Sequence, residues 1–260
     1  MKSNLIYDYV PCKISFDGSK VSLPQSVQFE IKRNWDNLIS SGKQFMNNEL
    51  FTIDSIEVED FQLKINVKKT LHDHYLYSVG KKFIGEHICR SLASNILILT
   101  SDNYYVLAVM SGKTSLPNKV KFIGGSLSEE DLTNSILDPL KCVKRETYEE
   151  IGLKFESNIN ITPRYFMTRA NLSFVNILYV AEIDMSHKDI KDLFDRYKKK
   201  SQNSEFELNN ILFVKNDVDE IKSFIKESRQ SLIDYMEELF YVLIGESEAK
   251  SMVEEIIDKR

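Results

Sequence analysis

The sequence predicts an α/β protein in which helices cover both faces of a mixed β-sheet, preceded by a small N-terminal α/β subdomain. Strand pairs followed by alternating helices and strands favour such a sheet. A separate helix and hairpin pattern occupies the first ninety residues. Of the 260 residues, 42% are hydrophobic and 11% aromatic, which is enough for a substantial core and excludes a largely disordered chain. We expect an N-terminal subdomain over 1–90 and a second domain over 91–260 that includes the C-terminal helices.

The N-terminal subdomain is predicted from two local patterns. Apolar residues at helical spacing predict a helix over 27–39, followed by a turn at 40–42. Strands are expected over 51–58 and 61–67, because the second of these alternates strictly between apolar and polar residues. Asp60 would lie in the turn between them. These patterns therefore predict a helix followed by a β-hairpin in this region.

From about residue 91 the predicted elements form a longer series. Two apolar strands over 95–100 and 104–110 are separated by Ser101-Asp102-Asn103, a plausible hairpin turn. The remaining predicted elements are a strand over 119–123 that ends in Gly124-Gly125, a strand over 173–183, an amphipathic helix over 187–200, a strand over 210–214, and helices over 219–226, 230–244 and after 246.

Charge and composition exclude several classes of protein. The net charge of −5 argues against a general nucleic-acid binder, so we expect no nucleic-acid partner. Three scattered cysteines are too few for a disulfide framework. The N-terminus lacks the apolar region of a signal peptide, and the apolar run 239–244 is far shorter than the ~20 residues of a membrane span. We expect a cytoplasmic protein without a membrane contact.

A predicted helix over 139–151 contains most of the candidate catalytic residues. Asp138 is a good N-cap, Pro139 suits the first helical position, and Gly152 suits the left-handed residue at the end. The predicted buried stripe consists of Leu140, Val143, Thr147 and Ile151. The charged residues Arg145, Glu146, Glu149 and Glu150 are left around the rest of this helix, at what we expect to be an exposed end.

Three carboxylates are crowded into little more than one turn of this helix. Glu146, Glu149 and Glu150 repel one another, and the negative end of the helix dipole adds to the repulsion. A divalent cation would remove the penalty, and hard oxygen ligands suit Mg²⁺. Arg145 is placed to pair with Glu149 at i,i+4. The alternative interpretation is a solvated acidic face.

The segment from Arg145 to Leu153 resembles the REUxEExGU half of the Nudix box, with Thr147 where an aliphatic residue is usual. The strand that enters Gly124-Gly125 resembles the start of the same box. The resemblance covers roughly residues 91 to 245 and implies the Nudix αβα sandwich as the fold.

The resemblance implies a metal site and a reaction. The glutamates that match Glu146, Glu149 and Glu150 hold Mg²⁺ or Mn²⁺ in the family, where the metal bridges a pyrophosphate and activates water. Arg145 would belong to the catalytic group and Gly124 and Gly125 to the substrate site. A late-loop acid often serves as a base or further ligand; the resemblance favours Glu207 for it over Glu205.

One departure from the family pattern concerns spacing. The box runs G-x5-E-x7-R-E, so its Gly and Arg are 14 positions apart, whereas Gly125 and Arg145 are 20 positions apart. Six extra residues therefore lie in the loop. Glu129, Glu130 and Asp131 all compete for the place of the first box glutamate.

The front of the chain resembles the UDP-glucose pyrophosphatase-like branch of the family. The matching segments are Asn34-Trp35, residues 48–51, Lys69-Thr70, residues 75–80, and Glu207 ahead of the strand 211–214. This resemblance implies hydrolysis of a UDP-sugar to UMP and a sugar 1-phosphate.

The alternatives are hydrolysis of another nucleoside diphosphate derivative, such as ADP-ribose or a dinucleotide, and a non-catalytic nucleotide sensor. The presence of both Glu149 and Glu150 favours an enzyme. The sequence leaves a homodimer open.

Overall fold

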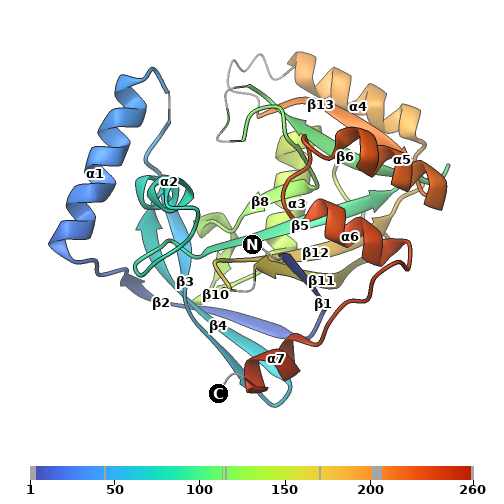
Figure 1. Ribbon diagram of the computed structural model, residues 1–260. Helices are drawn as coiled ribbons and strands as arrows, with labels where there is room; N and C mark the ends of the chain where they lie inside the picture. Colours follow the sequence, from blue (N-terminus) through green and yellow to red (C-terminus); the bar gives the residue numbers. More distant parts are fainter. Residues whose placement is uncertain are drawn as a thin grey trace.

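The computed structural model describes residues 4–43, 45–112, 114, 116–169, 171–200 and 207–258. These residues form one mixed sheet with helices on both of its faces (Figure 1), which confirms the predicted fold class. One path of the sheet runs β1-β11-β12-β5-β3-β4-β2-β10-β9, and β6, β7, β8 and β13 branch from it beside β5. No helix in the described part of the chain is long and apolar enough to cross a membrane.

The N-terminal region contains more elements than the sequence patterns predict. Its elements are β1 (Asn4–Asp8), β2 (Cys12–Lys20), α1 (Gln25–Ser40), β3 (Glu49–Glu59), β4 (Gln62–Leu71) and α2 (His72–Gly80). The predicted helix and hairpin correspond to α1, β3 and β4, and Asp60 lies in the turn with a positive φ of 49°. β1, β2 and α2 are not predicted.

The first strands belong to the same sheet as the later ones. β1 pairs antiparallel with β11 (Ile161–Arg169), and β3 meets β5 (Ser91–Leu99) where Thr52 pairs with Ser91. A continuous hydrogen-bonded sheet thus crosses the predicted domain boundary at residue 90. The division into two domains stays a prediction.

The segment before Gly124-Gly125 differs from its prediction. Instead of one strand over 119–123, the chain forms β7 (Val120–Lys121) and β8 (Ile123–Ser126). β7 pairs with β6 (Tyr104–Met110), whereas β8 pairs with β5. β5 and β6 pair with each other only at two positions near their turn. Because they separate beyond it, the chain enters between them and changes partner at the buried Phe122.

The next segment holds a short hairpin that the sequence patterns do not predict. Its elements are the 3₁₀ helix η1 (Glu129–Asp131), β9 (Leu132–Thr133) and β10 (Ile136–Leu137). Asn134 and Ser135 form its turn with φ values of 49° and 66°. β10 pairs with β2. This hairpin therefore joins the N-terminal region to the segment that precedes the helix over 139–151.

The rest of the chain follows the predicted order. Its elements are α3 (Pro139–Ile151), β11, β12 (Phe174–Glu182), α4 (His187–Lys200), β13 (Leu208–Lys215), α5 (Val218–Ser228), α6 (Met236–Leu243) and α7 (Met252–Asp258). Apolar residues of α3 and α4 pack into one core cluster, and those of α5 and α6 into another. The sheet is therefore the middle layer of three.

The helix predicted over 230–244 begins only at Met236. The reason is a competing backbone pairing. The Val120 N–H donates to the Ser231 carbonyl at 2.8 Å, and the Ile233 N–H donates to the Val120 carbonyl at 3.0 Å. These residues extend the sheet beside β7, so the helix starts after them.

Both ends of α3 are as predicted. The Asp138 carboxylate accepts hydrogen bonds from the backbone N–H groups of Leu140 at 2.9 Å and Lys141 at 3.3 Å. Gly152 ends the helix in the left-handed region at φ 73°. These caps fix where the helix begins and ends, and therefore which side chains face the sheet.

We expect Asp138→Ala to lower the free energy of unfolding by about 1 kcal/mol, because two N–H groups at the start of α3 lose their acceptor. Asp138→Asn is the matched control, since asparagine caps helices about as well. Urea denaturation of both variants measures the effect. Equal losses in the two variants would contradict a capping role.

Candidate active site

Two glycines let β8 lie directly against its neighbours, Gly124 against β5 and Gly125 against α3. Gly124 has φ 130°, and a Cβ at this residue would lie 2.3 Å from the Ser94 carbonyl oxygen. A Cβ at Gly125 would lie 2.5 Å from a carboxylate oxygen of Glu146. The Gly124 N–H donates to Glu150 at 2.9 Å. Gly124 is thus required by packing against β5 and Gly125 by packing against Glu146, and their predicted contact with substrate stays a prediction.

Glu150 is buried, which corrects the expected exposed position. Its side chain is only 4% exposed, and its Oε1 lies 2.6 Å from the Nζ of Lys121 on β7. The Lys121 ammonium also donates to the Gly124 carbonyl at 2.6 Å. Burial raises the pKa of Glu150, and Lys121 and the Gly124 N–H oppose this rise. A positive partner from the sheet therefore makes the burial of this carboxylate tolerable.

Glu146 lies beside this pair and is also largely buried. Burial, followed by repulsion from Glu150, raises the pKa of Glu146 from 4.5 to about 7. Arg145 and Lys121 lower this pKa in part. The Arg145 guanidinium donates to Glu146 at 2.8 Å. The positive charges around the two glutamates thus do not fully offset their burial and repulsion.

Arg145 ties together three acidic side chains. Its Nε and Nη2 donate to the two oxygens of Asp131 at 3.1 and 2.9 Å. Its Nη1 donates to Glu149 at 2.9 Å, which is the i,i+4 pairing expected from the sequence. Asp131 is fully buried and also accepts from the Ser128 N–H at 2.8 Å. The guanidinium therefore has one fixed orientation.

Of the three acids that compete for the place of the first box glutamate, Asp131 is the one beside Arg145, and its assignment to that place stays a prediction. Of the three candidates, it alone shares hydrogen bonds with Arg145 in the described residues, while Glu129 contacts Lys69. Gly125 and Asp131 are separated by five residues, the G-x5-E interval of the box. Counting forward from Gly125 finds it directly. The six extra residues therefore follow Asp131, in the segment that forms the β9–β10 hairpin.

Glu207 directly precedes β13 and lies beside the end of β6. Its carbonyl accepts from the Ser111 N–H at 2.7 Å. Its negative charge contributes to raising the pKa values of both Lys121 and Glu150, so its exposed carboxylate lies within electrostatic range of that pair. Glu205, the other candidate for this acid, lies outside the described residues.

Lys121 is the site residue that sequence reasoning missed. It interrupts an otherwise apolar segment, Val120-Lys121-Phe122-Ile123. Both of its neighbours Val120 and Phe122 are buried, as is Lys121 itself. A lysine in such a strand requires a carboxylate partner, and this requirement is the signal by which it could have been found.

The acidic residues suit a divalent cation in their chemistry but do not form a preassembled cage. Among the described residues, no three side chains of Asp, Glu, His or Cys converge on one point in metal-binding geometry. Arg145 holds Glu149, and Lys121 holds Glu150. Carboxylate oxygens are the ligands that Mg²⁺ and Mn²⁺ accept, and a cation would relieve the repulsion between Glu146 and Glu150. The donor set therefore fits, provided that these side chains rearrange.

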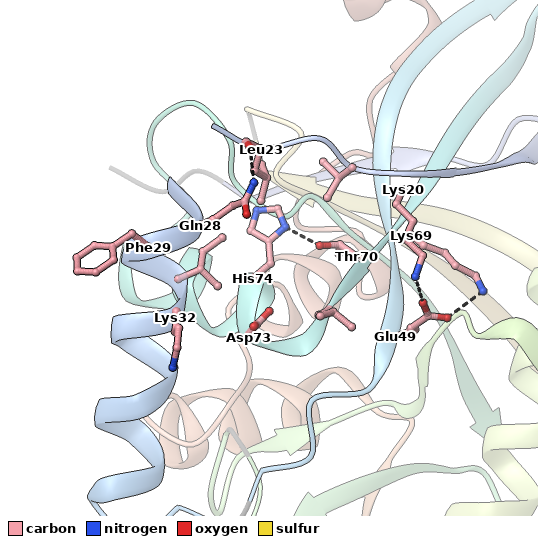
Figure 2. Close-up of a pocket in the computed structure, with 13 residues that line it drawn as sticks. Lys20, Leu23, Gln28, Phe29, Lys32, Glu49, Lys69, Thr70, Asp73 and His74 are labelled. Carbon is pink, nitrogen blue, oxygen red and sulfur yellow. Dashed lines mark hydrogen bonds and ion pairs between the residues drawn. The ribbon is translucent and has the colours of Figure 1, made fainter. Parts of the chain in front are cut away.

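A cavity of about 520 Å³ lies elsewhere, in the N-terminal region between α1 and the strands (Figure 2). Its lining includes Lys20, Lys69 and Glu49, where both lysines contact the glutamate. None of the α3 glutamates lines it. Lys69 also contacts Glu129 in η1, so one side chain joins the cavity to the turn that carries Asp131.

No family model and no curated protein matches the sequence. Among solved structures, the chain is similar to a Nudix hydrolase from Nitrosomonas europaea, with 11% identity over 62% of this chain and 93% of that chain, and a TM-score of 0.38. A MutT protein from Methanosarcina mazei gives 13% identity over 60% and 94% of the two chains, at a TM-score of 0.38.

A third similar structure is a bifunctional NMN adenylyltransferase/ADP ribose pyrophosphatase from Francisella tularensis, complexed with AMP and a Mn ion. Its identity is 10% over 67% of this chain and 47% of that chain, at a TM-score of 0.37. These likenesses are too distant to assign an activity. The function proposed below therefore depends on the residues of this chain.

The raised pKa of Glu146 predicts a pH dependence of stability in the metal-free protein. Because this pKa is about 7 in the folded state, against the ordinary glutamate value of 4.5, the folded state binds the additional proton between these values. The contribution of Glu146 to the free energy of unfolding is therefore fully present below pH 4.5, and it is lost as the pH rises from 4.5 to 7. Glu146→Gln should remove on the order of 1–3 kcal/mol of this change.

The measurement is the free energy of unfolding from pH 5 to pH 8 in the presence of a chelator. Glu149→Gln is the matched control, because it removes a half-exposed carboxylate from the same helix. A Glu146→Gln slope equal to that of the unmodified protein would contradict the burial argument.

Proposed function

We propose that this chain is a divalent-metal-dependent pyrophosphohydrolase of the Nudix type, which cleaves a nucleoside diphosphate linked to another moiety. The observation that carries the proposal is the packing of Glu146 and Glu150 of α3 against Gly124-Gly125, beside an Arg145 that is fixed by Asp131. This arrangement concentrates carboxylate oxygens that repel one another at one surface of the helix. A divalent cation would relieve that repulsion and would in turn attract the phosphates of a ligand.

Each residue of this group has a distinct part in the proposed reaction. A bound Mg²⁺, or Mn²⁺ in its place, would supply Lewis acidity toward the phosphates and lower the pKa of the attacking water. Glu146, Glu149 and Glu150 would hold the cation, with Glu207 as a further ligand or base. Arg145 orients Glu146 and Glu149 through the bonds described above. Gly124 and Gly125 would contribute the backbone of β8 to the substrate site, as the family resemblance implies.

The preferred substrate in this proposal is a UDP-sugar, with UMP and a sugar 1-phosphate as the products. Support comes from the hairpin that follows Asp131, because β10 pairs with β2 and so joins the elongated box loop to the leading region. A small leading region and a long box loop are the features that the UDP-glucose pyrophosphatase-like branch combines. ADP-ribose and dinucleotides are the alternative substrates. A cytoplasmic location and the absence of a nucleic-acid partner also stay predictions.

A nucleotide-sensing module without catalysis is the second candidate. It is favoured by one observation: Lys121 and Arg145 already occupy oxygens of Glu150 and Glu149. A protein that binds nucleotides without turnover could retain these internal ion pairs permanently. Enzyme and sensor differ in whether phosphate bonds are broken.

The test is hydrolysis of a panel with Mg²⁺ or Mn²⁺: UDP-glucose, ADP-ribose, NADH, a dinucleoside polyphosphate and capped RNA, with the products identified. Glu149→Gln should lower turnover by about 100-fold or more. This variant is chosen because the half-exposed Glu149 can change without disturbing the core. Glu156→Gln, an exposed glutamate just beyond the helix, is the matched control and should retain full turnover.

UMP release from UDP-glucose would support both the chemistry and the substrate. If only another substrate of the panel were hydrolysed, the proposed pyrophosphohydrolase reaction would be supported and the UDP-sugar would be excluded as the substrate. Nucleotide binding without any turnover would favour the sensor, and equal turnover in the two variants would contradict the site.

A further inference from the structure

The Lys121 ammonium is the cationic partner of Glu150 in this structure. It is 2.6 Å from Oε1 of Glu150 and 2.6 Å from the Gly124 carbonyl oxygen. The side chain is about nine-tenths buried. Glu146 and Glu207 also act on this ammonium electrostatically. The ammonium thus contacts one backbone carbonyl and one carboxylate, and two further glutamates lie within electrostatic range of it.

Both of these contacts are made by oxygen atoms, the ligand type that hard divalent cations prefer. An ammonium and a divalent cation repel each other, so both are not accommodated on the same carboxylate oxygen. The Lys121 side chain is long and flexible, whereas Gly124 and Glu150 are held by β8 and α3. The lysine is therefore the partner that can move.

We propose that Lys121 is an internal counter-ion that competes with the divalent cation for Glu150 and leaves this carboxylate when the cation binds. The inference depends on the proposed function, because it takes Glu150 as a metal ligand. In the metal-free protein Lys121 stabilises the fold by neutralising a buried carboxylate. The same contact lowers the affinity for the metal, since the lysine must be displaced first.

The experiment measures Mn²⁺ binding to the full chain after removal of metal, by isothermal titration calorimetry and by the electron paramagnetic resonance signal of free Mn²⁺. Lys121→Met should bind Mn²⁺ about tenfold more tightly than the unmodified protein or better. Lys144→Met is the matched control, because it removes one exposed lysine of α3 and changes the net charge equally. It should leave the affinity unchanged.

Lys121→Met leaves Glu150 without its partner and therefore tests folding as well as binding. Without metal its melting temperature should fall, and saturating Mn²⁺ should raise it more than in the unmodified protein. Lys121→Gln, which retains a hydrogen-bond donor for the Gly124 carbonyl, is measured alongside. In the double variant Lys121→Met/Glu150→Gln the gain in Mn²⁺ affinity should disappear.

The outcomes separate this inference from the proposed function. Unchanged or weaker Mn²⁺ affinity in both Lys121 variants, with normal binding by the unmodified protein, would overturn only the counter-ion role. Mn²⁺ binding by the Lys121 variants, with none by the unmodified protein, would support the counter-ion role, because it would mean that Lys121 fully blocks the cation. No Mn²⁺ binding by any of the proteins would overturn the counter-ion role and the metal-dependent function together.

Discussion

Buried negative charge at the junction of α3 and β8 is the constraint on which the site depends. Asp131, Glu146 and Glu150 are all largely buried there, and the cationic partners that contact them are Arg145 and Lys121. An unpaired carboxylate in such surroundings costs several kcal/mol. The partner change from β7 to β8 places Lys121 and the Gly124 N–H on the same carboxylate. The local fold and the chemistry of the site therefore have a common cause.

The same constraint connects the N-terminal region to the glutamates. Asp131, which orients Arg145, begins the segment whose hairpin pairs with β2, and its neighbour Glu129 contacts Lys69 at the cavity. A ligand that reached this cavity would thus contact the same side chains that hold the turn in place. The leading strands serve as part of the framework of the site, since they share its sheet.

Local patterns in the sequence predicted those features that depend on neighbouring residues. The ends of α3 followed from Asp138, Pro139 and Gly152, because caps act within one helical turn. The burial of Glu150 did not follow, since it requires Lys121 from another element. The late start of α6 was missed for the same reason: the pairing of Val120 with residues 231–233 joins segments that are distant in the sequence.

The claim that the α3 glutamates hold a divalent cation is tested most directly by crystals grown with Mn²⁺ and measured for its anomalous scattering. We predict one strong anomalous peak bounded by the carboxylates of Glu146 and Glu150, with the Lys121 ammonium moved away from Glu150. A peak elsewhere, or none beside α3 while Lys121 still contacts Glu150, would contradict this claim.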